Sequence, residues 1–399
     1  MTTELSTINL DAHIALRRDI HAHPELAFDE HRTADLIAAR LASMGIEIHR
    51  GVGGTGVVGV LKRGTSKRMI GLRADMDALP LTEANRFAHA STVAGRMHAC
   101  GHDGHVAMLV AAAQVLAENA MLDGTVVFIF QPGEESGRGA RVMIADGLFD
   151  RWPVETVFAA HNWPGLGVGQ FAVAPGPMMA ACNTFTLTIE GKGGHAALPH
   201  LTVDPVLAGA ALVQALQAIV ARATPADEAA VLSIGMFEAG SSPHIIPDRA
   251  TLRGTVRTFS AARTDAIETQ MRTIAEGVAM AHGCSVTLDF ERNCAATLNS
   301  AAETALVAEA LSKRFGDVAV ERATPAMTAE DFAFMLEARP GAYFWIGNGD
   351  GDARAPGHAV GPCALHNPSY DFDDRLIAIG AAAWVAITEH FFESQPSTA

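Results

Sequence analysis

Four short, continuously apolar segments alternate with amphipathic helical patterns over the first 180 residues of the chain. The predicted strands are residues 57–62, 69–74, 125–131 and 156–160, and the predicted helices are residues 12–21, 32–44 and 105–118. Strands that are apolar along their whole length are typical of a sheet covered by helices on both faces. Because strands and helices alternate, we expect an α/β layer fold.

The pattern changes after residue 182, where strands alternate between apolar and polar residues. We predict strands at 185–190, 231–237, 251–259 and 285–290, and helices at 205–223 and 263–282. This β-α-β-β-α-β order is that of a ferredoxin-like unit. We therefore predict a ferredoxin-like domain of residues 183–294, inserted into an α/β domain formed by residues 1–182 and 295–399. In the second part of the α/β domain we expect helices at 301–315, 329–336 and 373–392 and a strand at 342–346.

Composition narrows the range of partners. With 29 basic and 44 acidic residues, the formal net charge is −15 at pH 7, which disfavours binding to nucleic acid or to an anionic membrane surface. Five cysteines without regular spacing do not form a disulfide framework. The N-terminal residues lack the pattern of a signal peptide, and no apolar stretch reaches the length of a membrane span. We therefore expect a cytoplasmic protein that does not bind membranes.

A dense group of potential metal ligands lies in the segment MHACGHDGH, residues 97–105. It contains His98, Cys100, His102 and His105, next to glycines that let the backbone turn. Thiolate and imidazole together suit a borderline metal such as zinc. A single histidine is more often a core residue, but four ligand-type side chains within eight residues favour a metal site. The segment has no HExxH or CxxC pattern, which excludes the zincin and zinc-finger classes.

Ligand-type residues also follow three of the predicted strands. Asp75 and Asp77 follow 69–74, Glu134 and Glu135 follow 125–131, and His161 follows 156–160. In open α/β sheets, ligands bind beyond the carboxyl ends of the strands. The two glutamates would repel each other unless a cation or proton separates them, although an acidic surface loop is the alternative. His366, in a loop before the last helix, is a weaker candidate by itself.

These motifs resemble those of the co-catalytic metallopeptidase family of aminoacylases and carboxypeptidases. The similarity is greatest to the branch of hippurate hydrolases and indole-acetyl-amino-acid (auxin-conjugate) amidohydrolases. It spans nearly the whole chain. The matching segments are RRDIHAHPELAFDE (17–30), IGLRADMDALP (70–80), MHACGHDGHVAML (97–109), FQPGEE (130–135), AAHNWPG (159–165), GKGGHAALPH (191–200), MTAEDFAFML (327–336) and LHNPSYDFDD (365–374).

The resemblance implies a metal-binding α/β domain with an inserted ferredoxin-like domain that acts as a lid and often dimerises. It implies two divalent metal ions (zinc, manganese, cobalt or nickel) and five ligands, namely Cys100, His102, Glu135, His161 and His366. Asp75 stands where related branches carry a ligand histidine, and Asp77 where they carry an aspartate that supports the ligands. We expect Cys100 to replace the missing ligand.

The expected reaction is hydrolysis of an N-acyl amino acid to a carboxylic acid and a free amino acid. The metals lower the pKa of water, and Glu134 takes up its proton as general acid/base. A dipeptidase or a carboxypeptidase could use the same site, and the motifs do not distinguish these enzymes from a hydrolase of N-acyl amino acids. A noncatalytic binding protein on this fold is the alternative from another class, but none of the expected ligands is missing.

Two histidines of the inserted domain complete the list of candidates. The resemblance implies that His195, in GKGGH, hydrogen-bonds the substrate carbonyl, often in the active site of a neighbouring subunit, so we expect a homodimer. His244 stands where relatives usually carry asparagine, near the expected substrate carboxylate. Because imidazole can carry a positive charge, we expect His244 to influence substrate choice.

Overall fold

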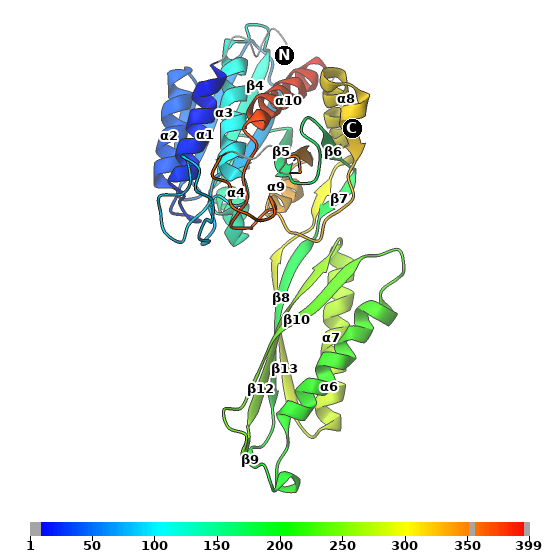
Figure 1. Cartoon of the computed structure of the whole chain (residues 1–399). Helices are drawn as coiled ribbons and strands as arrows, with labels where there is room; N and C mark the ends of the chain where they lie inside the picture. The colour runs from blue at the N-terminus through cyan, green and yellow to red at the C-terminus, as the bar shows by residue number, and fades with distance from the viewer. Residues whose placement is uncertain (1–8, 351–355, 395–399) are drawn as a thin grey trace. The chain divides into compact units, whose positions relative to one another are not determined.

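The computed structural model describes residues 9–350 and 356–394 (Figure 1). In this part of the chain, two compact units are present. Unit 1 consists of the residues up to 178, residues 298–324 and the residues from 331 onward, and unit 2 consists of residues 179–297 and 325–330. Our sequence prediction set the limits at 183 and 294. The structure in addition groups the short segment 325–330 with unit 2, so the chain passes between the units four times.

A mixed eight-stranded sheet forms the centre of unit 1. Its order is β1 (Glu47–Val52), β2 (Gly56–Arg63), β4 (Gly124–Gln131), β3 (Met69–Asp75), β5 (Thr156–Trp163), β16 (Gly341–Gly347), β6 (Phe171–Val173) and β15 (Val320–Arg322). The adjacent strands β4, β3, β5 and β16 run parallel to one another. Their carboxyl ends therefore lie at one edge of the sheet, where ligand-type residues were predicted.

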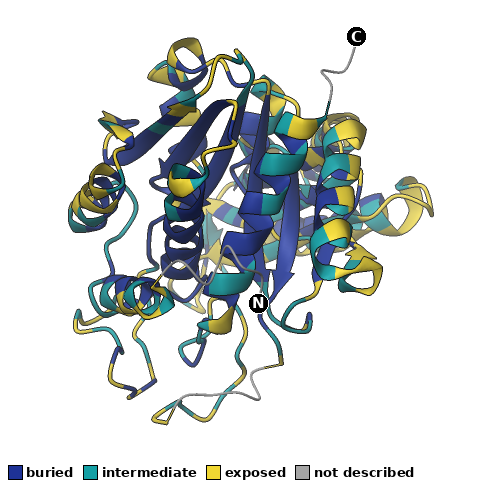
Figure 2. Ribbon diagram, turned by 90° about the horizontal axis from the view of Figure 1, so that it is seen from above, coloured by how far each residue is buried: buried dark blue, intermediate teal, exposed yellow. Residues whose placement is uncertain are grey.

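Helices cover both faces of this sheet, and the strands between them are buried (Figure 2). The helices of unit 1 are α1 (Leu10–Ala22), α2 (His31–Ser43), α3 (His102–Glu118), α4 (Gly139–Ala145), α5 (Leu148–Arg151), α8 (Ala301–Phe315), α9 (Ala333–Ala338) and α10 (Arg375–Glu393). Two glycines of β2 lie against helices on opposite faces of this sheet. A Cβ at Gly59 would meet Leu41 of α2, and one at Gly56 would meet Met143 of α4. These positions point to opposite faces because side chains alternate along a strand.

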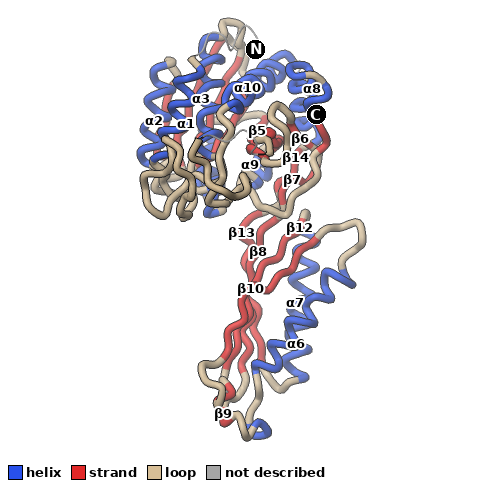
Figure 3. Tube along the Cα trace, in the orientation of Figure 1, coloured by secondary structure: helices blue, strands red, loops and turns tan. Residues whose placement is uncertain are grey.

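Unit 2 has the β-α-β-β-α-β order expected from the sequence (Figure 3). Its elements are β8 (Ala181–Glu190), α6 (Pro205–Ala218), β10 (Ala230–Ala239), β12 (Arg249–Thr258), α7 (Ala261–Ala281) and β13 (Ser285–Cys294). The sheet is antiparallel with the order β10-β12-β8-β13, which is the ferredoxin-like arrangement. Leu187, Leu212, Leu252 and Met271 belong to the core between the sheet and its two helices. The predicted fold class is confirmed.

Smaller elements complete the two units. Two-stranded sheets pair β7 (Gly176–Met179) with β14 (Thr297–Asn299) and β9 (Gly194–His195) with β11 (Ile245–Ile246). The short helical segments are η1 (Glu134–Ser136), η2 (Pro199–Leu201), η3 (Ile219–Ala223) and η4 (Asp317–Ala319).

Two helix starts differ from the prediction by three residues or more. Helix α3 begins at His102 rather than at residue 105, which places a candidate ligand in its first turn. Helix α9 begins at Ala333 rather than at residue 329. The four residues before Ala333 are not helical, because the chain passes there from unit 2 to unit 1.

By length and composition alone, two helical segments are long and apolar enough to cross a membrane, although neither is a continuous apolar run. They are residues 205–223 and 375–393, with mean hydropathies of 1.6 and 1.3. Core helices of soluble proteins have the same properties, and α10 packs against α3 and α8 in unit 1. Of the residues in the apolar window of 205–223, 28% are buried, and the apolar side chains of Val206 and Leu207 are exposed.

Candidate metal centre

Backbone geometry brings the candidate ligands to the carboxyl edge of the unit 1 sheet. Cys100 immediately precedes Gly101, which has a φ of 93° and is the N-cap of α3. A Cβ at Gly101 would lie 2.3 Å from the Asn162 side-chain oxygen, so only glycine permits this close approach. Gly133, also with positive φ, is the N-cap of η1, which carries Glu134 and Glu135.

All five predicted ligands converge at this edge. The Cys100 Sγ lies 3.4 Å from His161 Nε2 and 3.3 Å from His366 Nε2. The Glu135 Oε1 lies 3.3 Å from His366 Nε2 and 3.9 Å from His102 Nε2. Their ligand atoms form overlapping groups that lie close enough together to hold a metal ion. The structure thus assembles side chains that are up to 266 residues apart in the sequence.

Two buried ligand atoms indicate that a cation fits between these side chains. Neither His102 Nε2 nor Glu135 Oε1 has a hydrogen-bond partner among the described residues. A buried polar atom without a partner is costly, and a cation would satisfy both atoms. Thiolate, imidazole and carboxylate are together the donor set of zinc and similar divalent metals.

Neighbouring groups fix the orientation of the two buried histidine ligands. His102 Nδ1 lies 2.9 Å from the main-chain oxygen of Asp77, and His161 Nδ1 lies 2.7 Å from that of Asn162. Because a carbonyl oxygen only accepts, each Nδ1 carries the proton. Each Nε2 is then free to donate its lone pair toward the centre, the usual arrangement for a metal-ligating histidine.

The charges around the centre match this assignment. Burial lowers the pKa of His102, but the carboxylates of Asp75, Asp77 and Glu135 overcome this effect and raise it to about 10. Burial raises the pKa of the Cys100 thiol, and Glu135 raises it further. The centre is therefore rich in negative charge, and a bound cation would favour both the thiolate and a neutral imidazole.

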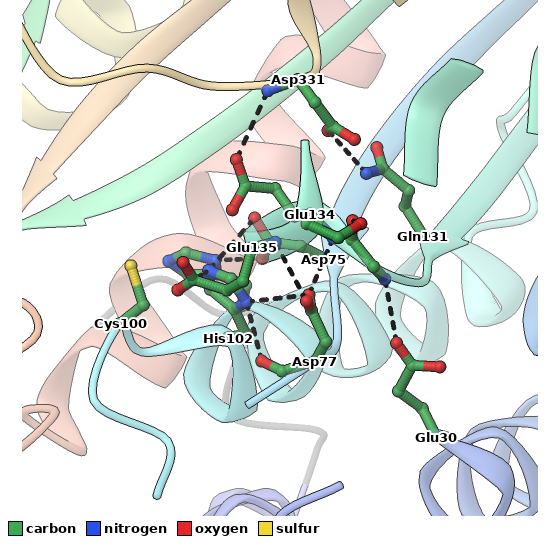
Figure 4. A network of polar contacts seen from close by, with 12 residues as sticks. Glu30, Asp75, Asp77, Cys100, His102, Gln131, Glu134, Glu135 and Asp331 are labelled. Atoms are coloured by element: carbon green, nitrogen blue, oxygen red, sulfur yellow. Dashed lines mark hydrogen bonds and ion pairs between the residues drawn. The ribbon is translucent and has the colours of Figure 1, made fainter. Parts of the chain in front are cut away.

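Asp77 holds the segment that carries the two glutamates (Figure 4). Its two carboxylate oxygens accept the backbone N–H groups of Glu134 and Glu135, each at 3.0 Å. Glu134 lies beside His102 and Glu135, and its Oε1 accepts the backbone N–H of Asp331 at 3.3 Å. Asp77 thus occupies a supporting position, and Glu134 lies next to the ligand cluster.

Asp75 is likewise engaged by other side chains. Its carboxylate lies 2.8 Å from Arg73 Nη1, 2.5 Å from His105 Nδ1 and 3.6 Å from His102 Nε2. The other ring nitrogen of His105 lies 2.7 Å from the Asn162 side-chain oxygen. His105 could join a metal group with Asp75 and His102, but both of its ring nitrogens already have partners. Of the four Cys and His residues between 98 and 105, Cys100 and His102 are therefore the two that face the cluster of predicted ligands.

His195 and His244 lie in unit 2 and not among the ligands. His195 is in β9, where it pairs with Ile245 of β11, and Ala196 donates its backbone N–H to the His244 oxygen at 3.0 Å. Both histidines are exposed. The two residues predicted to contact substrate from the inserted domain are thus close together in the sheet of β9 and β11.

Sequence reasoning missed several residues that support the centre. They are Arg73, Gln131, Asn162 and Asp331, all of them buried. A signal was available for Arg73, because a charged residue inside an otherwise apolar strand needs a buried partner.

Comparison with known proteins identifies the family. Residues 71–390 match the family described as Peptidase family M20/M25/M40. The chain belongs to this family. Its curated M20/M25/M40 relatives include the hippurate hydrolase of Campylobacter jejuni, 38% identical over 93% of this chain and 94% of the relative. The IAA-amino acid hydrolase ILR1-like 4 of Arabidopsis thaliana is 35% identical over 96% of this chain and 87% of that relative.

A solved M20 structure gives the same result for the fold. The YXEP protein of Bacillus subtilis, described as a dinuclear metal-binding peptidase, is 32% identical and superimposes with a TM-score of 0.84. The match covers 97% of this chain and 99% of that one. The family and the branch predicted from the motifs are confirmed.

Proposed function

We propose that the protein is a metal-dependent amidohydrolase that cleaves N-acyl amino acids to a carboxylic acid and a free amino acid. The observation that carries this proposal is that the five proposed ligands converge beside Glu134, which is not one of them. These ligands are Cys100, His102, Glu135, His161 and His366. Relatives named as a hippurate hydrolase and an IAA-amino acid hydrolase support the substrate class, because both names denote N-acyl amino acids.

Two divalent metal ions are the proposed cofactors, with zinc, manganese, cobalt and nickel as candidates. Bound there, they would act as Lewis acids that polarise the amide carbonyl and lower the pKa of water toward ~7. The unpartnered atoms His102 Nε2 and Glu135 Oε1 support this assignment, as does the description of the YXEP protein. Two dications would outweigh one thiolate and one carboxylate, which favours an anionic substrate.

Glu134 is the proposed general acid/base. Its backbone N–H is held by Asp77, and its carboxylate lies beside the ligand cluster. From there the carboxylate takes the proton of the attacking water and gives it to the leaving amine nitrogen, so that the C–N bond breaks without a covalent enzyme intermediate.

Hydrolysis of a panel of substrates tests the reaction class. The metal-loaded protein is assayed on N-acetyl, N-benzoyl and indole-acetyl amino acids, and on dipeptides and peptides with a free carboxyl terminus. We expect kcat/KM to be highest for an N-acyl amino acid. A preference for dipeptides or peptides would instead favour the alternative, a dipeptidase or carboxypeptidase with the same centre, and no turnover of any of them would favour a noncatalytic binding protein.

We further propose that the protein is a cytoplasmic homodimer that interacts with neither nucleic acid nor membranes, and that unit 2 forms the dimer contact. The net charge of −15 supports the exclusion of polyanions. Strand β10 is at an edge of the unit 2 sheet and exposes Met236 and Phe237, while α6 exposes Val206 and Leu207. A second copy of unit 2 would cover these side chains and pair with the open strand edge.

His195 and His244 are proposed to contact the substrate. His195 would donate a hydrogen bond to the carbonyl oxygen in the active site of the neighbouring subunit, where negative charge develops during attack. His244 would influence which amino acid is accepted. Their proximity across β9 and β11 supports a shared role for the two residues.

A further inference from the structure

Asp331 is the residue at which the chain re-enters unit 1, and its side chain is buried. Its backbone N–H lies 3.3 Å from Glu134 Oε1. Its carboxylate accepts from the side-chain amide of Gln131 at 2.7 Å, the backbone N–H of Ala140 at 2.9 Å and the guanidinium of Arg73 at 3.3 Å. The side chain of Asp331 thus fixes the position of a backbone donor that contacts Glu134 (Figure 4).

Arg73 links this arrangement to the metal centre. It is buried in β3, and its guanidinium contacts Asp75 at 2.8 Å and the Gln131 side-chain oxygen at 2.9 Å as well as Asp331. Asp75 in turn lies beside the ligand His102. One buried cation therefore connects the ligand side of the centre to the residue that contacts Glu134.

We propose that Asp331 is a positioning residue for Glu134, acting through its own backbone N–H. This inference rests on the proposed function, in which Glu134 transfers protons during amide hydrolysis. General base catalysis depends on the distance between the base and the proton that it removes, and a displacement of about 1 Å can cost about 100-fold in rate. The carboxylate of Asp331 would keep residue 331, and with it the carboxylate of Glu134, at one distance from the metal ligands.

The hydrogen bonds around Asp331 make this proposal testable by an isosteric change. Both of its oxygens face donors, because Arg73 Nε bonds the Gln131 oxygen and so turns the Gln131 NH₂ toward Asp331. In Asp331→Asn, the new NH₂ group must face either Gln131 and Arg73 or the N–H of Ala140. We expect kcat to fall about 10- to 100-fold, while KM changes less than about threefold and both metals stay bound.

A second substitution can restore the hydrogen bonds of Gln131 and Ala140 with residue 331, although not the longer contact from Arg73 at 3.3 Å. In Gln131→Glu alone, two carboxylates would face each other across 2.7 Å, so we expect kcat to fall as well. In the double variant Gln131→Glu/Asp331→Asn, the amide and the carboxylate are exchanged. One oxygen of the carboxylate introduced at position 131 would then accept from Arg73. Its other oxygen would accept from the amide at position 331, whose own oxygen would accept from Ala140. We expect the double variant to recover at least about tenfold in kcat over either single variant.

The controls separate positioning from general destabilisation. Asp123→Asn is the matched control, since Asp123 also holds backbone N–H groups of unit 1, those of Thr65 and Ser66 at 2.7 and 2.8 Å, but lies in an exposed turn. It should leave kcat unchanged. Circular dichroism and metal analysis of each variant show whether it is folded and loaded.

Three results would overturn the proposal. These are a wild-type kcat in folded Asp331→Asn, loss of metal from that variant, and additive losses in the double variant. If Asp331→Asn does not fold, the double variant decides, because near-wild-type kcat supports the proposal and a low kcat with both metals bound contradicts it. Glu134→Gln is measured in parallel. If that variant stays active, the proposed function itself is wrong, whatever the result at position 331.

Discussion

The imidazole of His21 lies 2.9 Å from the carboxylate of Asp103, and both side chains are buried. The other ring nitrogen of His21 lies 3.2 Å from Glu83. This contact joins α1 to the first turn of α3, one residue after the proposed ligand His102. Burial lowers the pKa of His21, but Asp103 and Glu83 overcome this effect and raise it above its ordinary value.

His21→Gln should therefore destabilise the protein most at low pH. Because the pKa of His21 is higher in the folded than in the unfolded chain, its charge stabilises the fold fully below about pH 6.5, the unfolded value. This contribution is lost as the pH rises through the folded value. We expect a loss of about 1–3 kcal/mol in the free energy of unfolding near pH 6, and a smaller loss at higher pH. Denaturant unfolding at several pH values and constant metal concentration measures the free energy of unfolding and how the loss changes with pH. His23→Gln, on a side chain that is 42% exposed, is the control and should cost less stability near pH 6 than His21→Gln. A difference that grows with pH would contradict the assignment.

Glu134→Gln should abolish turnover while the metals remain bound. Glutamine cannot take up the proton of the attacking water, so a loss of about 10²–10⁴-fold in kcat is expected. Glu135→Gln should instead release metal, since it removes a ligand. Elemental analysis of the two purified variants, together with kinetics, distinguishes them. If Glu134→Gln loses its metal, the roles of the two glutamates are assigned wrongly.

Removal of metal by a chelator should lower both activity and the midpoint of thermal unfolding, and added metal should restore both. A ligand that binds only the folded state stabilises it by about 2.7 kcal/mol at 100 times its Kd. Cys100→Ser should require a higher metal concentration for the same midpoint, because it removes the thiolate ligand. Cys284→Ser, in unit 2, is the matched control. An identical metal dependence of wild type and Cys100→Ser would remove Cys100 from the ligand set.

His195→Ala should lower kcat by about 10²–10³-fold, the effect of losing one donor to an oxyanion. If His195 acts in the neighbouring subunit, a mixed dimer of His195→Ala and Glu134→Gln contains one site with both native residues. Coexpression with two different affinity tags allows the mixed dimer to be purified and assayed. We expect it to recover part of the wild-type activity. A mixed dimer as inactive as its parents would show that His195 does not act across the interface.

His244→Asn should change the ranking of substrates. Asparagine retains hydrogen bonding but cannot become a cation, so relative kcat/KM among acyl amino acids should shift more than tenfold, which is about 1.4 kcal/mol. His200→Asn, an exposed histidine in η2, is the control and should leave the ranking unchanged. An unchanged ranking in His244→Asn would place this residue outside the substrate site.

The sequence was most informative where chemistry is concentrated in short segments. Cys100 and His102 in the segment 97–105, the two glutamates after β4 and the histidine in β5 could be recognised locally, and the structure brings their side chains together. The pairing of Arg73 with Asp331 could not be predicted in this way, because the two residues are 258 positions apart and belong to different motifs. The start of α9 was misplaced for a related reason. Helical periodicity around residue 329 does not show that the chain changes units at residue 331, where the backbone N–H turns toward Glu134.

The grouping of residues 325–330 with unit 2 limits how the two units can be separated by protein engineering. Within unit 2, the backbone N–H of Ala180 is shared between the oxygens of Ala326 and Thr328, at 3.1 and 2.8 Å. In a chimera that takes only residues 179–297 from a relative, residue 180 would come from the relative and its partners at 326 and 328 from this protein. The hydrogen bonds between them would then have to form between two different parental sequences. An exchange that includes both stretches keeps these bonds within one parental sequence. For recombination between family members, the exchangeable unit 2 therefore consists of two separate sequence segments, 179–297 and 325–330.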